Sequence, residues 1–507
     1  MPDKSVIIIG AGLAGLSAGC YGRMNGYRTQ VFEQDTRPGG LCTSWERGVY
    51  TIHGNMAFLA GSGPGVAYYR FWRELGVFPE IQIVDCDYML IIERRDGPTF
   101  YFHNDLERLE RHMKELAPEE GRLIDELIRG IRVFARYDLP IEKAPELLGL
   151  GDKIKLMTSS LPLIWAMRKW GKTPLQDIAR RFQSPILREA LQEFAQLFSE
   201  DLPAAFFLLS VAWNHRKSFG YPVGGGLKFA RAIERRFLEL GGEVHYRSRV
   251  VKILVKDDRA VGVRLEDGRE LPADDVISAA DGRSTIFEWL GGKYTDANIR
   301  TIYKNWSVSS PVILVALGVS RSFPEVSWSA AGTVYPLEQP VNIGGKEFQK
   351  LRPMIYNYDP TLAPPGKTLL RLVIPAAYDH WDALRGAPDA YRTEKEKIAE
   401  TVIGLLDKRY PGLAAQVEMR DVATPLTFER YTGNWRAGMM GWQLTSKTLS
   451  KSIPKTLPGL GNFHMAGQWV ETFAGIPGSA LSGRNVIQLL CRRDKKDFVS
   501  GYRSVPS

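Results

Sequence analysis

The stretch Ser5-Val6-Ile7-Ile8-Ile9-Gly10-Ala11-Gly12-Leu13-Ala14-Gly15 decides the fold of this chain. Its first five residues form a β-branched apolar run, which is typical of a strand buried in a parallel sheet. The next six residues fit G-x-G-x-x-G, the turn that joins a strand to a helix and cradles the pyrophosphate of a dinucleotide. Gly10 would make the tight turn, Gly12 would let the backbone approach the pyrophosphate, and Gly15 would let helix and strand pack closely.

The residues that follow complete the unit. A helix is predicted from Leu13 to Asn25, with its N-terminal amides directed at the phosphates. A second strand is predicted over Tyr27–Glu33. Glu33 lies 18 residues beyond Gly15, where a carboxylate accepts hydrogen bonds from the adenosine ribose and repels a 2′-phosphate. The cofactor is therefore NAD or FAD.

Two later segments favour FAD. Arg37-Pro38-Gly39-Gly40 directly follows the second strand and permits another close backbone approach. Near the C-terminus, Asn462–Gln468 predicts a strand, and Ala474–Gly483 predicts a small-residue turn that opens a helix directed at the flavin. No second complete fingerprint with its strand and helix is present, so a nicotinamide domain is not expected. Electrons would leave to oxygen, a quinone or another diffusible acceptor.

Together these segments resemble the carotenoid-desaturase and isomerase class of flavoproteins: bacterial phytoene desaturases, carotenoid isomerases and retinol saturases, within the amine-oxidase-like superfamily. The motifs that carry the resemblance are Gly10–Gly15, Pro38-Gly39-Gly40, Gly48–Gly54, Tyr221–Gly226, Ala279-Ala280-Asp281, Met465-Ala466-Gly467 and Gly475-Ile476-Pro477-Gly478. The resemblance implies non-covalent FAD in an α/β, Rossmann-type domain that is discontinuous in sequence and carries an inserted α+β substrate domain.

The resemblance also implies which residues meet the cofactor. Val250 or Val251 would contact the adenine, with Val251 as the assignment, and the corner at 279–281 would lie near the nucleotide. After Ile52 the family commonly has Asp, whereas this chain has His53. His53 and Glu471 are the candidates for polar groups near the flavin. The complete set of expected cofactor residues is Gly10, Gly12, Leu13, Ala14, Gly15, Glu33, Gln34, Gly39, Gly40, Leu41, Val251, Ala280, Gly467, Gly475 and Ile476.

The middle of the chain returns to the cofactor domain. A helix over Leu227–Leu240 is predicted to precede three strands with a hairpin turn at Asp267-Gly268, and then a buried strand over 275–280. We therefore expect a cofactor domain made of residues 1–60, 220–300 and 415–495. The substrate domain would comprise residues 61–219 and 301–414.

Composition excludes several classes of function. The 507 residues are 44% hydrophobic and 24% charged, as in ordinary globular proteins, and the net charge is +9. No basic run with interleaved aromatic residues indicates nucleic-acid binding. Four scattered cysteines without a C-x-x-C pair and seven histidines without ligand spacing predict neither disulfides nor a metal site.

No apolar stretch approaches the ~18 residues that a membrane-spanning helix needs. Residues 6–21 hold the cofactor glycines and are not a cleavable signal. We expect a cytoplasmic protein, with Lys153–Lys172 as a membrane-facing helix. That segment has five basic and no acidic residues, apolar residues at helical spacing, and Trp165 and Trp170. The alternative is a cap over the substrate tunnel, kinked at Pro162.

The leading hypothesis is an FAD-dependent oxidoreductase that desaturates, saturates or isomerises carbon–carbon bonds of a long apolar polyene or isoprenoid lipid. The apolar stretch Ala204–Trp213 could form the wall of its tunnel. Two alternatives remain open at this stage. One is an amine-oxidase-like flavoenzyme that oxidises a C–N bond, and the other is a prenyl-lipid escort protein on the same fold.

Overall fold

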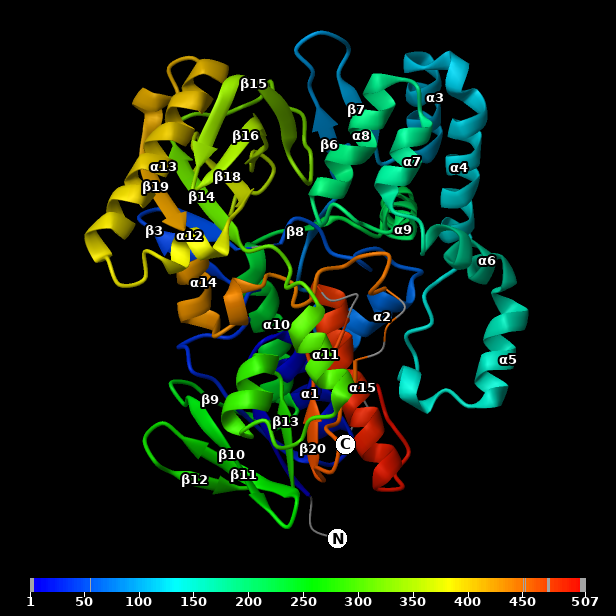
Figure 1. Ribbon diagram of the computed structural model, residues 1–507, viewed down its shortest axis with the longest axis vertical. Helices are drawn as coiled ribbons and strands as arrows, with labels where there is room; N and C mark the ends of the chain where they lie inside the picture. Colours follow the sequence, from blue (N-terminus) through cyan, green and yellow to red (C-terminus); the bar gives the residue numbers. More distant parts are fainter. Residues whose placement is uncertain (1–3, 55, 450, 452, 472–474, 502–507) are drawn as a thin grey trace.

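The computed structural model describes residues 4–54, 56–449, 451, 453–471 and 475–501. Ala474, where the predicted C-terminal turn begins, lies outside these residues. Figure 1 shows a parallel sheet and its helices in the lower half of the molecule. An antiparallel β part and a group of helices occupy the upper half.

The predicted first strand lies in the middle of a five-stranded parallel sheet, in the order β20-β13-β1-β2-β9. The strands are β1 (Ser5–Ile9), β2 (Arg28–Phe32), β9 (Glu243–His245), β13 (Asp275–Ser278) and β20 (Phe463–Met465). Val6 and Ile8 belong to one buried cluster and Ile7 and Ile9 to another, so both faces of β1 are covered. The predicted α/β class is confirmed.

Three helices from distant parts of the chain pack on one face of this sheet: α1 (Leu13–Met24), α10 (Gly225–Glu239) and α15 (Gly475–Arg493). Small residues allow the close approach. A Cβ at Gly483 would lie 2.3 Å from the carbonyl oxygen of Ala14, so only glycine lets α15 lie this near α1. The sheet and its helices draw on all three predicted pieces of the cofactor domain, whose bounds stay predictions.

The other face of the sheet is covered by an antiparallel unit with the predicted hairpin turn at Asp267-Gly268. Its strands are β10 (Val250–Lys256), β11 (Arg259–Leu265) and β12 (Glu270–Pro272). A second hairpin, β3 (Ser44–Arg47) with β4 (Tyr50–His53), follows β2 and leads the chain towards the upper half.

The upper half contains two four-stranded sheets, in the orders β17-β18-β14-β19 and β16-β15-β6-β7. The strands are β6 (Tyr88–Ile92), β7 (Phe100–His103), β14 (Val312–Val319), β15 (Thr333–Ile343), β16 (Lys346–Leu351), β17 (Pro353–Ile355), β18 (Thr368–Pro375) and β19 (Val417–Ala423). A two-stranded pairing of β5 (Ile83–Val84) with β8 (Tyr221–Pro222) links the halves. Three further helices are α12 (Tyr378–Asp382), α13 (Pro388–Arg409) and α14 (Pro425–Thr432). Helix α11 (Ala297–Asn305) lies lower, in the cluster of buried residues that covers one face of the parallel sheet.

Helices make up the rest of the upper half. They are α2 (Ala67–Glu74), α3 (Leu106–Leu116), α4 (Gly121–Arg136), α7 (Leu175–Arg181), α8 (Pro185–Gln196) and α9 (Ala204–His215). Helix α9 is apolar almost all round and almost entirely buried, as expected for a helix inside a core.

The segment Lys153–Lys172 differs from the single kinked helix that the sequence predicts. It forms α5 (Leu150–Ser159) and α6 (Leu161–Trp170), separated at Ser160. Pro162 lies in the first turn of α6, where its missing N–H costs no hydrogen bond, so it starts a helix and does not kink one. In the described part of the chain, no helix is long and apolar enough to cross a membrane.

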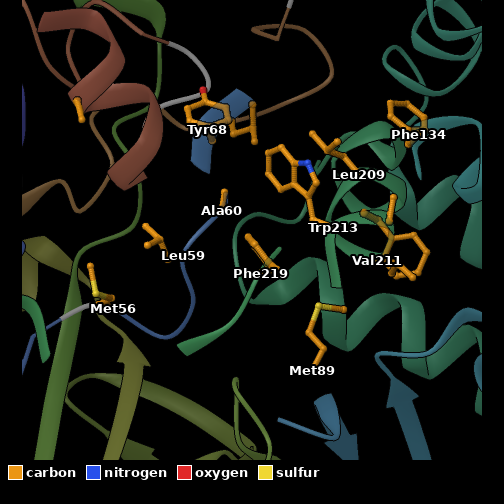
Figure 2. Close-up of a cluster of buried hydrophobic side chains, with 14 of the residues drawn as sticks. Met56, Leu59, Ala60, Tyr68, Met89, Phe134, Leu209, Val211, Trp213 and Phe219 are labelled. Atoms are coloured by element: carbon orange, nitrogen blue, oxygen red, sulfur yellow. The ribbon is translucent and has the colours of Figure 1, made fainter. Parts of the chain in front are cut away.

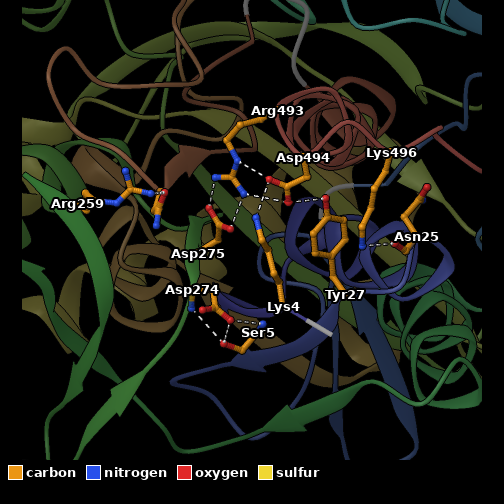
Figure 3. A network of polar contacts seen from close by, with 11 residues as sticks. Lys4, Ser5, Asn25, Tyr27, Arg259, Asp274, Asp275, Arg493, Asp494 and Lys496 are labelled. Carbon is orange, nitrogen blue, oxygen red and sulfur yellow. Dashed lines mark hydrogen bonds and ion pairs between the residues drawn. The ribbon is translucent and has the colours of Figure 1, made fainter. Parts of the chain in front are cut away.

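Polar contacts fix the far end of α15 to the start of the parallel sheet (Figure 3). Arg493 forms a bidentate ion pair with the buried Asp275 at the start of β13, with one nitrogen–oxygen distance of 2.7 Å. Asp494 accepts a hydrogen bond from Tyr27 at 3.0 Å and pairs with Lys4 at 2.8 Å. The opposite end of α15 is thereby held against the cavity described next.

Candidate functional site

A cavity of about 1020 Å³ lies where the carboxyl ends of β1, β2 and β13 meet, the place where open α/β sheets bind ligands. Thirteen of the fifteen residues expected to contact a cofactor line it: Gly10, Gly12, Leu13, Ala14, Glu33, Gln34, Gly39, Gly40, Leu41, Ala280, Gly467, Gly475 and Ile476. Four segments far apart in the sequence therefore converge on one wall.

The three fingerprint glycines occupy three different environments. Gly10 has φ +97°, a conformation that only glycine adopts easily, and it turns the chain from β1 towards α1. A Cβ at Gly12 would meet no atom within 4 Å and would project into open space. Gly15 does not line the cavity, because its Cα rests against the backbone of Gly10. This arrangement leaves room for a pyrophosphate at Gly12 and at the N-terminus of α1.

Glu33 is held in place by backbone donors. Its carboxylate accepts hydrogen bonds from the N–H groups of Ala11 (2.7 Å) and Asp35 (2.9 Å). Burial raises the pKa of Glu33, although these two N–H groups act in the opposite direction. Each carboxylate oxygen has a second lone pair that could accept a ribose hydroxyl. The acid and the glycine turn are thus linked directly.

The second glycine pair lies against the first. The N–H group of Gly39 donates to the carbonyl oxygen of Ala11 at 2.9 Å, and Gly12 and Gly39 form an isolated parallel bridge. Gly39 and Gly40 both have positive φ angles, of +114° and +59°. A third glycine, Gly467, has φ +102° and donates its N–H to Ser482 Oγ. These backbone turns form a cradle that suits a dinucleotide.

Two expected cofactor residues lie elsewhere. Gly15 has the packing role described above, and Val251 is 37% exposed on the outer side of β10. Val250 lines the cavity in its place, because alternate residues of a strand point to opposite faces. The expected assignment of Val251 therefore does not match the cavity lining, in which Val250 stands.

The two candidate polar residues do not line the cavity. His53 is fully buried, and its Nδ1 lies 3.1 Å from a guanidinium nitrogen of Arg371. Burial, with the charge of Arg371 as a smaller cause, holds the pKa of His53 well below its usual value. Glu471 pairs with the buried Lys455 at 3.0 Å. Neither geometry indicates a catalytic role.

The upper part of the cavity has an apolar wall. Phe206 and Trp213 of α9 line it, as the tunnel hypothesis for Ala204–Trp213 requires. Phe219 packs against Trp213 and against Phe58, with ring centroids 5.8 Å and 4.2 Å apart. Figure 2 shows Trp213 and Phe219 among other buried apolar side chains. The cradle and this wall belong to one continuous cavity.

Acidic side chains that line the cavity are all bonded within the described part of the protein. Besides Glu33, Asp281 accepts from the N–H groups of Ser284 and Trp435. Glu288 pairs with Arg283, and Glu429 pairs with Arg385. Three lining arginines, Arg352, Arg371 and Arg430, form no ion pair with an acid among the described residues, and no sequence motif pointed to them.

One cluster of metal-ligand side chains is present among the described residues: Asp105, Glu107 and His215. Asp105 caps α3 by accepting from the N–H of Arg108, and His215 Nδ1 accepts from the N–H of Leu106 at 3.2 Å. These bonds account for the positions of both side chains without an ion. The four cysteines are unpaired and buried.

Comparison with known families agrees with this geometry. Residues 13–490 match the family described as flavin containing amine oxidoreductase. The chain is 23% identical over 506 residues to the lycopene-forming phytoene desaturase of Pseudescherichia vulneris, covering 96% of this chain and 99% of that protein. It is 25% identical over 495 residues to the chloroplastic prolycopene isomerase of Arabidopsis thaliana, covering 90% and 76%.

Solved structures share the fold at lower identity. An oxidoreductase from Methanosarcina mazei superposes with a TM-score of 0.61 at 18% identity, over 96% of this chain and 100% of that chain. Putrescine oxidase bound to putrescine superposes with a TM-score of 0.58 at 14% identity, over 97% and 99%.

Proposed function

The chain belongs to the family of flavin containing amine oxidoreductases, and we propose that this oxidoreductase acts on carbon–carbon bonds of a long apolar polyene or isoprenoid lipid. The observation that carries the proposal is the single cavity in which the dinucleotide cradle continues into an aromatic wall. The names of the phytoene desaturase and prolycopene isomerase relatives support a polyene substrate.

The flavin would be FAD bound without a covalent bond. Backbone turns at Gly12, Gly39 and Gly467 and the carboxylate of Glu33 suit a dinucleotide that is held by hydrogen bonds. Cys42 is the one cysteine that lines the cavity. Burial raises the pKa of its thiol to about 12, so the reactive thiolate is scarce at neutral pH.

When bound, the flavin supplies hydride transfer, and the protein supplies position and a dry environment. Phe58, Trp213 and Phe219 would hold an apolar chain against the cradle and exclude water from it. Oxygen or a quinone would take up the electrons, since the sequence contains no second dinucleotide fingerprint.

The charges of the cavity disfavour an amine substrate. The lining acids at Asp281, Glu288 and Glu429 already accept hydrogen bonds or form ion pairs, so none of them offers an ammonium group an unpartnered carboxylate. The unpaired charges at Arg352 and Arg371 would repel a cation. The cavity therefore suits a neutral or acidic chain better than a cationic one.

We also propose that α5 and α6 bind an anionic membrane surface. Leu150, Ile154 and Trp165 are 81%, 61% and 63% exposed, and α5 buries none of its residues. Five basic residues accompany them, and each could add ~1 kcal/mol at an anionic surface. Because α6 packs against α9, this patch lies one helix away from the apolar wall.

The test is product analysis with the FAD-loaded protein in both redox states. Phytoene and a cis-polyene are supplied in mixed micelles, and products are separated and weighed by mass spectrometry. Loss of two hydrogens, gain of two hydrogens or an unchanged mass with a new isomer would each support the proposal. The protein would instead be an amine oxidase if it leaves polyenes unaltered in both redox states of the flavin and releases aldehyde and peroxide from simple amines. Tight binding of prenyl lipid by a protein without flavin would indicate an escort protein.

A further inference from the structure

Two arginines line the same cavity: Arg371 on β18, and Arg352 in the junction between β16 and β17. Met354 of β17 pairs with Arg371 of β18 in antiparallel register, so both side chains lie on one face of the sheet. Arg352 lies two residues before Met354, in the junction just before β17. Arg352, Met354 and Arg371 all line the cavity, as does Val373 two residues further along β18.

Arg371 is fixed by the protein. It is 1% exposed and donates to the carbonyl oxygens of His53 (3.0 Å) and Gly54, while a second nitrogen lies 3.4 Å from the sulfur of Met354. Its buried Nε has no hydrogen-bond partner. Carbonyl oxygens orient the guanidinium but do not neutralise it, so Arg371 places a net positive charge beside the cavity.

Arg352 is less constrained. It donates one hydrogen bond, to the carbonyl oxygen of Ala331, and no other hydrogen bond or ion pair from its guanidinium reaches a described residue. Burial, with the charge of Arg371 as a second cause, lowers the pKa of Arg352 to about 10. Arg352 therefore stays charged at neutral pH. One edge of its guanidinium therefore keeps its N–H groups available. Two N–H groups on such an edge can bind the two oxygens of a carboxylate.

A buried cation without an acidic partner is costly to fold; Arg371 is buried and Arg352 is partly buried. The ion pairs of the described residues join neither arginine to an acid, and the nearby Glu193 is already paired with Lys350 at 2.6 Å. The cationic face opens into the space whose other wall is the aromatic cluster at Phe58, Trp213 and Phe219. A ligand that satisfies both walls has an anionic end and a long apolar body.

We infer that Arg352 and Arg371 form the binding site for a carboxylate on the end of the substrate, so the substrate is a polyene acid and not a hydrocarbon. This inference rests on the proposed function, because it names the substrate class for that cavity. Arg352 would bind the carboxylate directly, and Arg371 would act through its charge. The apolar wall would hold the polyene body.

The experiment measures binding to the FAD-loaded protein by isothermal titration calorimetry in mild detergent. The two probes are all-trans-retinoic acid and its methyl ester, which share the polyene body and end in a carboxylate and in a neutral ester. We expect the acid to bind roughly tenfold tighter or more, the usual strength of a hydrogen bond to a charged group. Arg352→Gln should abolish the preference, and Arg352→Lys should retain part of it. The exposed Arg180→Gln is the matched control and should keep the preference.

Several results would overturn the inference. Equal affinity for acid and ester in the wild type would do so, as would an acid preference that survives Arg352→Gln. A variant that keeps the preference but shifts the flavin midpoint potential would assign the arginines to the flavin. In each of these cases polyenes still bind, so the proposed function stands. If acid, ester and phytoene all fail to bind, the proposed function itself is wrong and the inference falls with it.

Discussion

A Cβ atom at Gly15 would lie 1.9 Å from the carbonyl oxygen of Gly10, so the first turn of α1 rests directly on the end of β1. The neighbouring Gly12 has open space in front of it. The two glycines therefore have different roles. Gly15 allows the helix to pack on the strand, and Gly12 leaves space for the ligand.

This difference gives the first prediction. Gly12→Leu should fold normally but purify colourless, because its side chain would occupy the space of the pyrophosphate. Gly15→Ala should instead lower the free energy of unfolding by about 1–3 kcal/mol or more, since an overpacked contact with the backbone must be relieved. Flavin absorbance and urea unfolding of the two variants separate the effects. Retention of FAD by Gly12→Leu would contradict the assignment of the cradle.

The second prediction concerns pH. His464 of β20 is buried, and burial, with the charge of Arg493 as a smaller cause, lowers its pKa to about 3. The unfolded chain takes up a proton near pH 6.5, whereas the folded protein does not, so stability falls as the pH drops from 6.5 towards 3. The unfolding free energy of the wild type should fall between pH 7 and pH 5. In His464→Gln this fall should be smaller by about 2 kcal/mol. Urea titrations of both proteins at the two pH values test this, and parallel losses would disprove it.

The third prediction concerns the membrane surface. The double variant Ile154→Ser, Trp165→Ser should bind anionic vesicles of phosphatidylglycerol and phosphatidylcholine at least tenfold more weakly, because two exposed apolar side chains no longer enter the interface. Binding of the wild type should weaken with salt. Leu238→Ser on α10 is the matched control, since Leu238 is also exposed. Equal sedimentation of all three proteins with vesicles would remove the proposal.

The fourth prediction concerns Glu471. Lys455 is nearly buried and pairs with Glu146 at 2.9 Å and with Glu471 at 3.0 Å. Lys455→Met should therefore cost about 1–3 kcal/mol of unfolding free energy, because it leaves Glu471 and Glu146, which are only partly exposed at 25% and 32%, without their cation. Lys408→Met, in an exposed pair with Glu338, should cost below about 1 kcal/mol. Equal effects of the two substitutions would show that Lys455 has no special structural role.

The lower half, which contains the parallel sheet, could be predicted from sequence because its motifs are local. The strand, three glycines and helix of residues 5–25 follow one another directly, and each residue has one physical reason to be there. Glu33 follows within the same unit. The corner at Ala280 and the turn at Gly467 were found from shorter motifs that depend on the same backbone requirements.

The upper half could not be predicted in this way, because its contacts join residues that are distant in the sequence. Arg371 bonds to His53 across 318 positions in the sequence. Its nearness to the cavity that Arg352 also lines depends on how β16, β17 and β18 are arranged, which local patterns do not reveal. His53 was a candidate polar group because of its motif, but tertiary packing turned it towards Arg371 and away from the cavity.

The most direct test of the central claim is an anaerobic titration of the oxidised, FAD-loaded protein with polyene while the flavin absorbance near 450 nm is recorded. If the protein removes hydrogen from a polyene, the band should bleach in proportion to added phytoene or polyene acid, and air or a quinone should restore it. A protein that saturates or isomerises should leave the band unchanged, and should alter the polyene only after prior reduction with dithionite. Bleaching by simple primary amines, with no polyene altered in either redox state, would contradict the account.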